Sequence, residues 1–499
     1  MKQKGTILAI DQSTSSTKAM LVSTRGDILD QKALSHKQIY PQPGWVEHDA
    51  EEIFGNVLQV ISALIKDNAD KSDDLIALSI TNQRETFVVF DRENGKPLHN
   101  AIVWQCRRGD PFCKKLSQDG HDQHVHNLTG LKIDTYFPAS KLHWLIRNHS
   151  DLGKKLEEGT ALFGTIDTYL IYRLTDGAVY ATDHTNASRT LFYDIEKLNW
   201  SESLCDIFQI RFAQLPEILE SSEQFGDTDL GGNLKHRIPI CGVMGDSQAA
   251  LFAQKCYKPG GAKVTFGTGS SILLNIGHEK PAADQEAVTA LAWVINNEPT
   301  YAYEGIINFT GATITWLRDQ LQMITDAAET EELAKSVTDN GGVYLVPAFV
   351  GLSAPYWRAD ARAAILGMTP STTRAHIVRA ALESIGFIVT DVLKSMSEEA
   401  GVALNVIHAD GGAIDNAFLM QFVADMNQLI VHAAEIPELS ALGAVFQAFL
   451  GLKLVSSLED LKGFSSGFTL FEPTMNVKEA NQLLNCWETA VSKVLYREE

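Results

Sequence analysis

The sequence predicts an α/β protein with two related halves. Apolar, β-prone runs alternate with helical patterns along the whole chain, and two hairpins of similar plan begin at Thr6 and Lys263. Alternating strands and helices are typical of α/β architecture, and similar hairpins half a chain apart indicate an internal repeat. Domains typically contain roughly 100–200 residues, so a chain of 499 residues is expected to form two large domains or three smaller ones.

The composition fits a chain that buries a large core, with 45% hydrophobic and 21% charged residues. The net charge of −20 argues against binding to a nucleic-acid backbone or an anionic membrane, since both repel it. An anionic nucleotide is not excluded, because a turn rich in amide groups and one Mg²⁺ ion reverse the potential locally.

The six cysteines are scattered and include no C-x-x-C pair, which argues against a disulfide framework or a zinc site. The chain enters a strand at Thr6 and leaves no room for a signal peptide. No apolar run approaches the ~18 residues that span a bilayer. We therefore expect a cytoplasmic protein with reduced thiols and no integral membrane segment.

The first half opens with a hairpin that carries an acid at its tip. Residues 6–10 form a strand that ends at Asp11, residues 12–18 form a polar turn, and residues 19–23 form the second strand. The elements expected after it are a helix at 51–66, strands at 75–82, 87–90 and 101–104, a helix at 141–148 and an apolar segment at 163–174.

The middle of the chain places a carboxylate close to a glycine-rich turn. An apolar strand runs into Gly245 and sets Asp246 at its end, and a helix follows at 249–255. Two further strands within 263–275 are joined by the turn 267–271. A Gly/Thr/Ser turn offers backbone N–H groups that hold phosphate oxygens, so this pattern suggests a kinase or a phosphohydrolase.

The second half repeats the strand–helix alternation. Gly311 opens a helix, and a glycine pair at Gly411-Gly412 lies between a strand and the next helix, which suits a nucleotide site. The other expected elements are a strand at 343–349, a long amphipathic helix at 375–398, a strand at 406–409 and an Ala-rich helix at 441–450.

Longer motifs carry a family resemblance. They are 40–49 (YPQPGWVEHD), 81–86 (TNQRET), 101–108 (AIVWQCRR), 182–190 (TDHTNASRT) and 346–357 (VPAFVGLSAPYW), with signature-like segments at 136–148 and 363–383. Through them the chain resembles the FGGY family of carbohydrate kinases, and within it the glycerol kinases. The resemblance runs from about Ile7 to the last helices.

The resemblance implies two actin-like ATPase (ribonuclease H-like) domains, 1–254 and 255–499, with a catalytic cleft between them. It implies ATP and Mg²⁺ as cofactors, a small polyol or sugar as substrate, and a homodimer or homotetramer. The loop 231–237 lacks the pattern with which some glycerol kinases bind fructose bisphosphate, so that regulation is not predicted.

Two acids are expected to carry the chemistry. Asp246 is the expected catalytic base, because a carboxylate at a strand end can accept the proton of the attacking hydroxyl. Asp11 is expected at the metal–phosphate end of the cleft, with Asp246 as a second acid near the ion. The alternatives are a helix-capping Asp246 and an ordinary turn Asp11.

The resemblance assigns the nucleotide to both halves. Here Ser13 and Lys18 replace the glycine and arginine that are usual in the family; Lys18 keeps the charge but loses the bidentate fork. The phosphates are expected at Ser13, Thr14, Ser15 and Lys18 and at Gly267, Thr268 and Gly269, and the adenosine at Gly311, Ile314, Thr315, Gly412, Ala413 and Asn416.

The alcohol site is expected to combine paired donors and acceptors with an aromatic wall. Glycerol kinases have Gln and Phe where this chain has Ser247 and Ser271, and both replacements are smaller. They favour a larger, more polar pocket, unless neighbouring side chains refill the space. The residues expected to build the site are Arg84, Glu85, Trp104, Tyr136, Asp246, Ser247 and Ser271.

The sequence thus predicts a glycerol kinase-like enzyme that converts ATP and glycerol or a related polyol to ADP and the polyol phosphate. Within that class, the alternative is a kinase for erythritol, threitol, a pentitol or xylulose. Outside it, the alternatives are an actin-like, nucleotide-driven binding module and a sugar-sensing pseudo-kinase. The paired acids and the alcohol-site residues argue against both.

Overall fold

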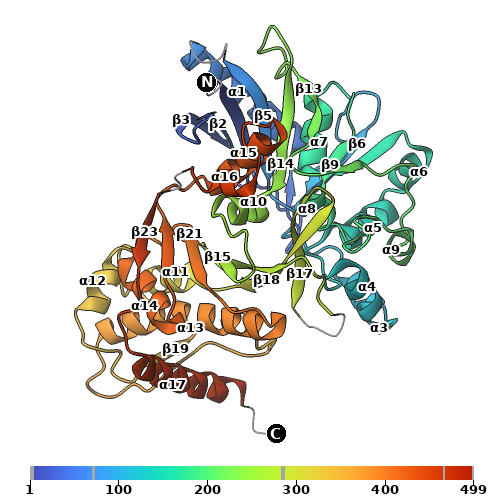
Figure 1. Cartoon of the computed structure of the whole chain (residues 1–499). Helices are drawn as coiled ribbons and strands as arrows, with labels where there is room; N and C mark the ends of the chain where they lie inside the picture. The colour runs from blue at the N-terminus through green and yellow to red at the C-terminus, as the bar shows by residue number, and fades with distance from the viewer. Residues whose placement is uncertain (1–4, 70–73, 283–286, 465–466, 497–499) are drawn as a thin grey trace. The chain divides into compact units, whose positions relative to one another are not determined.

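The computed structural model describes residues 5–69, 74–282, 287–464 and 467–496, and the chain divides into two compact units (Figure 1). The first unit consists of Met1–Lys255, His278–Ala302 and Glu438–Ser465. The second consists of Cys256–Gly277, Tyr303–Pro437 and Ser466–Glu499. Each unit contains both sheet and helices, which confirms the α/β class.

The main sheet of the first unit has the order β13 (Gln224–Thr228), β14 (Ile238–Gly245), β5 (Leu75–Asn82), β1 (Thr6–Gln12), β2 (Ser16–Ser23), β3 (Ile28–Ser35). β1 pairs antiparallel with β2 and parallel with β5, and β14 pairs parallel with β5. Leu8 and Ile10 are fully buried, and so are Ile7 and Ala9 on the other face. Both faces of β1 are therefore covered.

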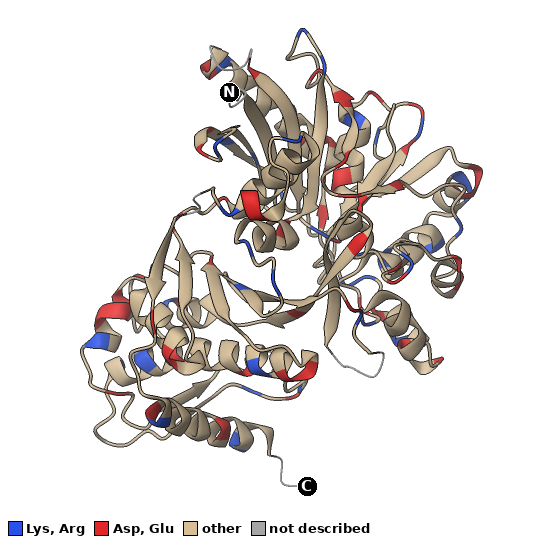
Figure 2. Ribbon diagram, in the orientation of Figure 1, with Lys and Arg blue, Asp and Glu red and all other residues tan. Residues whose placement is uncertain are grey.

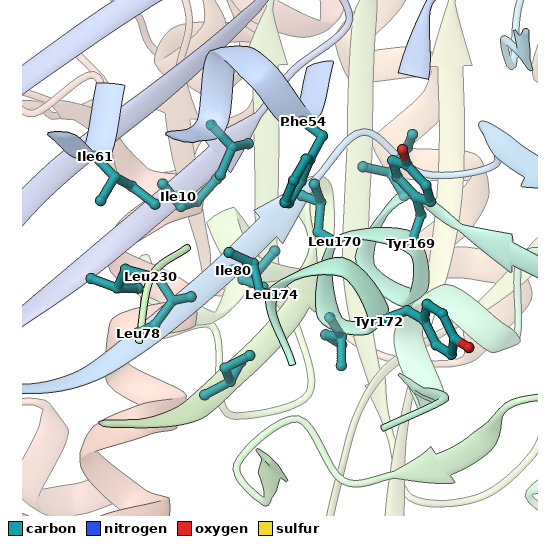
Figure 3. Close-up of a cluster of buried hydrophobic side chains, with 14 of the residues drawn as sticks. Ile10, Phe54, Ile61, Leu78, Ile80, Tyr169, Leu170, Tyr172, Leu174 and Leu230 are labelled. Carbon is teal, nitrogen blue, oxygen red and sulfur yellow. The ribbon is translucent and has the colours of Figure 1, made fainter. Parts of the chain in front are cut away.

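Helices cover this sheet and complete its core. α1 (Ala50–Asp67) and α7 (Ile166–Leu174) share one hydrophobic cluster with the central strands, while α15 (Leu439–Gly451) packs against β14, β5 and β1. Figure 3 shows side chains of α1 and α7 around those of the strands, with these labels: Phe54, Ile61, Ile10, Leu78, Ile80, Leu170 and Leu174.

The first hairpin is longer than the sequence suggests. β1 continues through Asp11 to Gln12, β2 already begins at Ser16, and Asp11 pairs with Lys18 in the ladder. The prediction that Asp11 ends the strand and that 12–18 is a turn was therefore wrong. Polar residues indicate a turn only when they face water, whereas here Gln12 and Thr17 are fully buried.

A second sheet of the first unit has the order β4 (Glu47–His48), β7 (Ala101–Ile102), β6 (Phe87–Asp91), β8 (Ala161–Thr165). The strand predicted at 101–104 ends at Ile102, because the carbonyls of Val103 and Trp104 accept hydrogen bonds from Lys141 instead. The remaining strands are β9 (Ala181–Asp183), β10 (Tyr193–Asp194), β11 (Asn199–Trp200), β12 (Glu217–Leu219) and β17 (Val288–Ile295). The remaining helices are α3 (Asp110–Gln118), α4 (Asp122–Thr129), α5 (Pro138–Asn148), α6 (Ser150–Glu158), α8 (His184–Ala187), α9 (Glu202–Ile207), α10 (Asp246–Ala253) and α16 (Leu458–Leu461).

The sheet of the second unit contains, in order, the part of β18 (Glu298–Ile307) from Tyr303 onward, β16 (Ser270–Gly277), β15 (Gly261–Phe266), β21 (Val406–Asp410), β22 (Val431–Ala434) and β23 (Phe468–Phe471). β15 pairs antiparallel with β16 and parallel with β21. In the first unit, β1 has the same relation to β2 and β5. The two units therefore repeat one plan, as the two hairpins indicate.

The second unit also holds the longest helix among the described residues, α13 (Arg374–Ala400), close to its predicted bounds. Its apolar side chains Val378, Ala380 and Ala381 join a core cluster with Leu317 and Leu345. The other elements are α11 (Gly311–Asp319), α12 (Glu329–Lys335), β19 (Tyr344–Val346), β20 (Ala364–Leu366), α14 (Ala417–Asn427) and α17 (Val477–Leu495).

The excess of acidic residues is not confined to one element. Figure 2 shows Asp and Glu spread over helices and loops of each unit, interspersed with Lys and Arg. Across the described residues, no helix combines the length and the apolar character needed to cross a membrane.

One helix contact in the first unit leaves no room for a side chain. A Cβ added at Gly443 of α15 would overlap the carbonyl oxygen of Ala249 in α10. At Gly55 of α1, by contrast, a Cβ would meet nothing within 4 Å.

We therefore expect Gly443→Ala to lower the free energy of unfolding by about 1–3 kcal/mol, because it overpacks a backbone contact. Gly55→Ala is the matched control and should raise it by about 0.5–1 kcal/mol through helix propensity. Urea denaturation monitored by circular dichroism measures both. Equal effects of the two variants would show that α10 and α15 can move apart freely.

Candidate active site

Asp246 lies where β14 passes into α10, at the first position of the helix. Its Oδ1 accepts the backbone N–H of Ser247 at 2.7 Å and lies 3.3 Å from Nε of Arg84. The N-cap residue is Gly245, so Asp246 is the first residue of the helix and not its N-cap. The Asp246 side chain remains 37% exposed, which leaves the carboxylate accessible to a substrate.

Arg84 stands between two carboxylates. Its Nε is 3.3 Å from Asp246 and 3.8 Å from Oε1 of Glu85, and its Nη1 donates to Oε1 of Gln248 at 3.2 Å. Glu85 in turn accepts a 2.6 Å hydrogen bond from Nε of Arg189. Glu85 and Arg189 are almost completely buried, at 2% and 0% side-chain exposure. Charges of alternating sign thus run from the interior of the unit to Asp246.

The backbone at Glu85 adopts φ 62°, in the left-handed region that a non-glycine residue rarely occupies. Thr86 N–H donates to the carbonyl of Arg84 at 2.8 Å and closes a tight turn. Such conformations persist where the surroundings over-determine them, and they cluster at functional sites. The turn directs Arg84 and Glu85 to different partners although the two are adjacent in the chain.

Two aromatic side chains form a wall in the same unit. The ring centroids of Trp104 and Tyr136 are 5.3 Å apart at an interplanar angle of 59°. Lys141, fully buried, donates to the carbonyls of Trp104 and Tyr136 at 3.3 and 3.1 Å and so fixes both segments. Burial lowers the pKa of Lys141 to about 7. The indole Nε1 of Trp104 donates to Oγ1 of Thr14 at 3.0 Å, which connects the wall to the first hairpin.

The turn of the first hairpin, residues 13–15, presents amide groups. The carbonyl of Ser13 accepts from Gln12 and Gln83 side chains, and the carbonyl of Thr14 accepts from Gln38. Among the described residues, the amides of Thr14 and Ser15 donate to no protein atom. Consecutive free amides of this kind form an anion-binding concavity.

Asp11 and Lys18 lie side by side at the base of that turn. Burial, together with the carboxylates of Asp246 and Glu438, raises the pKa of Asp11 to about 7, against the lowering effect of Lys18. Lys18 Nζ contacts both carboxylate oxygens of Glu438, at 3.1 and 2.9 Å. The charge of Lys18 is thus shared with Glu438, a residue that the sequence did not single out.

The turn of the second hairpin is tied to the start of α11. N–H groups of Gly311 and Ala312 donate to the carbonyls of Gly267 and Thr268, at 3.0 and 2.9 Å. A Cβ at Gly269 would overlap the carbonyl oxygen of Ile307, so this position requires glycine. In the described part of the chain, the amides of Thr268 and Gly269 make no hydrogen bond to protein.

A cavity of about 560 Å³ opens beside this turn, within the second unit. Its wall includes the predicted nucleotide residues Gly267, Thr268, Gly311, Ile314, Thr315, Gly412, Ala413 and Asn416. Leu382 and Ile385 of α13 and Leu419 of α14 add apolar surface to this wall. Asn416 also caps α14, accepting Leu419 N–H at 3.0 Å.

The two serines that depart from the glycerol kinase pattern lie in different units. Ser247 is the second residue of α10, and Ser271 lies on β16 opposite Thr265. The hydroxyl of Ser271 is buried and has no hydrogen-bond partner among the described residues. Sequence reasoning missed Arg189, Gln248 and Glu438. Of these three residues, only Arg189 lies in one of the longer motifs, at 182–190.

In the first unit, two acids accompany an amide-lined turn, and in the second unit an amide-lined turn borders a cavity. Each of these features suits a phosphotransferase. The model of the FGGY family of carbohydrate kinases, N-terminal domain, matches residues 6–253, and that of its C-terminal domain matches residues 262–452. The chain therefore belongs to the FGGY family of carbohydrate kinases. This membership decides against the actin-like binding module.

Curated relatives and solved structures show which members of this family the chain resembles. "Glycerol kinase 1" of Thermotoga maritima is 45% identical over 98% of this chain and 99% of its own, and a glycerol kinase of Klebsiella pneumoniae is 42% identical over 100% and 99%. The crystal structure of Plasmodium falciparum glycerol kinase with ADP aligns with a TM-score of 0.94 at 37% identity, covering 99% of each chain. A xylulose kinase from Lactobacillus acidophilus, at 21% identity and TM-score 0.87, shares the fold. The chain is thus a polyol kinase of the glycerol kinase type.

The raised pKa of Asp11 gives a pH dependence of stability. The pKa is about 7 in the folded chain and about 3.9 when unfolded. Between these values the folded state binds more protons, so this group makes stability fall as pH rises from about 4 to about 7.

We expect Asp11→Asn to be more stable than the wild type at pH 8, in the absence of ligands, and the difference to shrink by pH 5. Urea midpoints of both proteins at the two pH values measure the effect. Other buried acids contribute equally to both proteins and cancel. Parallel pH profiles would show that Asp11 is already ionised in the folded state.

Proposed function

We propose that this kinase transfers the γ-phosphoryl group of ATP to a terminal hydroxyl of a small polyol, with Asp246 as the catalytic base. The observation that carries the proposal is the position of Asp246: it stands at a strand end, accessible, 3.3 Å from the buried guanidinium of Arg84. The kinase membership of the chain supplies the reaction class.

The reaction requires one proton acceptor. As the hydroxyl oxygen of the polyol bonds to the γ-phosphorus, the bond to the bridging oxygen of ADP breaks, and the hydroxyl proton passes to Asp246. Arg84 orients the Asp246 carboxylate through their ion pair. Arg84 and Glu85 supply a donor and an acceptor for the other hydroxyls, and Trp104 and Tyr136 cover the C–H edge of the polyol.

Asp11 and Asp246 are the residues proposed to hold Mg²⁺. Mg²⁺ prefers one or two carboxylates completed by phosphate oxygens and water, and no group of three or more potential ligands is present among the described residues. The chemistry of Asp11 fits such an ion. Burial and neighbouring carboxylates disfavour the ionised form of Asp11, and a divalent cation would favour it. Such an ion would neutralise charge on the transferred phosphoryl group.

ATP is proposed to place its adenosine in the 560 Å³ cavity of the second unit. Gly412 lines that cavity, and a Cβ there would meet nothing within 4 Å. The amides of Thr268 and Gly269 would receive the β- and γ-phosphates, and those of Thr14 and Ser15 would assist from the first unit.

The acceptor is proposed to be glycerol or a related polyol of up to five carbons. The relatives named glycerol kinase favour glycerol. Ser247 and Ser271 favour a longer polyol, because both are smaller than the Gln and Phe that they replace. The unpartnered hydroxyl of Ser271 also offers a hydrogen-bonding group that Phe lacks. Erythritol, threitol and the pentitols are therefore the second candidates.

The role of Asp246 is tested by Asp246→Asn. We expect kcat to fall about 10²–10⁴-fold, because a neutral amide accepts no proton, while ATP binding stays nearly unchanged. Asp119→Asn, at an exposed acid that ends α3, is the control and should keep full activity. Coupled ADP assays and equilibrium binding give the two quantities. An active Asp246→Asn enzyme would remove Asp246 as the base.

The acceptor is tested by measuring ADP formation with glycerol, erythritol, threitol, xylitol, ribitol, xylulose and no acceptor. We expect a four- or five-carbon polyol to match or exceed glycerol in kcat/KM. Restoring bulk with Ser247→Gln and Ser271→Phe should shift the preference toward glycerol by about 10–200-fold, the range of one-methylene discrimination.

A wild-type enzyme that prefers glycerol by orders of magnitude would instead show that neighbouring side chains refill the pocket. Equal ADP formation with and without an acceptor would contradict the proposed transfer to a polyol.

A further inference from the structure

The segment that follows β9 is completely buried although it is mostly polar. Residues 182–190 (TDHTNASRT) include the short helix α8, and their exposed fractions do not exceed 8%. Family motifs do not by themselves say what this segment does. Its hydrogen bonds lead to three places in the candidate alcohol site, all within the first unit.

Asp183 is the centre of the segment. Its carboxylate caps α8, accepting the N–H groups of Thr185 and Asn186 at 3.0 Å each. It also accepts from Oγ1 of Thr185 at 2.7 Å, Nδ2 of Asn186 at 2.8 Å and Oγ of Ser221 at 2.8 Å. A buried carboxylate that accepts this many bonds fixes its donors in one orientation.

The first connection reaches the catalytic acid. Oγ1 of Thr185 donates to Asp183 and accepts the N–H of Gly245 at 2.9 Å. Gly245 is the last residue of β14 and directly precedes Asp246. A Cβ at Gly245 would lie 2.9 Å from Cγ of Arg84, so this glycine also packs against the aliphatic part of the Arg84 side chain. Thr185 therefore fixes the position of the backbone immediately before Asp246.

The second connection reaches the end of β5. Asn186 and Asn82 exchange two amide hydrogen bonds, at 2.9 and 3.1 Å. Asn82 is the last residue of β5 and also donates to the carbonyl of Gln83 at 3.0 Å. The reciprocal pair locks the strand end immediately before the Arg84–Glu85 turn.

The third connection reaches the alcohol-binding pair itself. Nε of Arg189 donates to Glu85 at 2.6 Å, and its guanidinium lies 5.1 Å from the ring centroid of Phe137 and 5.9 Å from that of Tyr136. Arg189 thus contacts both the acid and an aromatic side chain proposed to bind the polyol. A planar guanidinium suits this combination of ion pair and ring stacking.

We propose that Asp183, Thr185, Asn186 and Arg189 are the positioning residues of the acceptor site. Through Thr185 they fix Asp246 for proton transfer, and through Arg189 they orient Glu85 and Tyr136 for binding of the polyol. The proposal rests on the proposed function, and it divides the two tasks between two residues of one buried segment.

The division predicts opposite kinetic signatures. Thr185→Val keeps the shape but removes the acceptor of Gly245 N–H, and it should lower kcat about 10–100-fold with the polyol KM within about threefold, because small misplacements of a catalytic group are costly. Thr185→Ser retains the hydroxyl and should restore kcat to within about threefold.

Arg189→Lys keeps the positive charge. It removes the planar guanidinium, which bonds Glu85 and lies over the rings of Phe137 and Tyr136. It should raise the polyol KM about tenfold or more, while ATP binding, measured by equilibrium titration, stays within about twofold. The lysine variant is chosen because removal of the cation would leave Glu85 buried without a counter-charge.

The matched control is Thr190→Val. Thr190 is as buried as Thr185, but its hydroxyl bonds locally: within the described part of the chain it donates to the carbonyl of Ala187 and accepts from Phe192 N–H, and it has no other partner. It should lower the melting temperature about as much as Thr185→Val and leave kcat and KM within about twofold.

If Thr185→Val, Arg189→Lys and Thr190→Val lose stability alike and share one kinetic profile, the segment is merely structural and the proposal is overturned. If Thr185→Val fails to fold, the Thr185→Ser and Arg189→Lys profiles decide, and an unchanged polyol KM in Arg189→Lys refutes the assignment. A wild-type protein without polyol-dependent ADP formation would instead refute the proposed function.

Discussion

The site depends on one buried guanidinium. Arg84 lies between Asp246 and Glu85, at 3.3 and 3.8 Å, and is itself only 4% exposed. A cation in that position costs desolvation energy that neighbouring carboxylates must offset. Glu85 can help only because Arg189 balances it in turn. The charges are therefore interdependent, and an exposed carboxylate at Asp246 is the outward end of a series that begins in the core.

A protein with a net charge of −20 must still accept a polyanionic nucleotide. The phosphate sites proposed for it consist of neutral amide groups more than of cations. Lys18 shares its charge with Glu438, whereas the turns at 13–15 and 267–269 present amides whose carbonyls are held by neighbouring groups. Amide dipoles attract phosphate without adding a mobile charge, and they are insensitive to pH in the range where Asp11 titrates.

The sequence predicts much of this fold, because apolar runs and helical spacing are local properties. It predicts the strand end at Asp246, the turn at Gly267–Gly269 and the long helix α13. The sequence-based prediction fails where polar residues are buried within strands, as at Gln12 and Thr17, which were expected in a turn. Arg189 was missed because its partner, Glu85, lies 104 residues away, and no local pattern reports such pairing. The lining of the cavity in the second unit was predicted only in part, because its apolar wall on α13 resembles ordinary packing.

The chain returns to its first unit at Glu438–Ser465, where α15 packs against β14, β5 and β1. During synthesis, the sheet that carries Asp11 and Asp246 must therefore wait for nearly the whole protein before one of its faces is covered. Contacts of such sequence separation slow folding and leave apolar surface exposed in the meantime. A chain truncated before α15 would contain the strands of this sheet but not the helix that covers one of its faces. Asp11 and Asp246 are translated in the first half of the chain, but the scaffold that holds them is completed only late in translation.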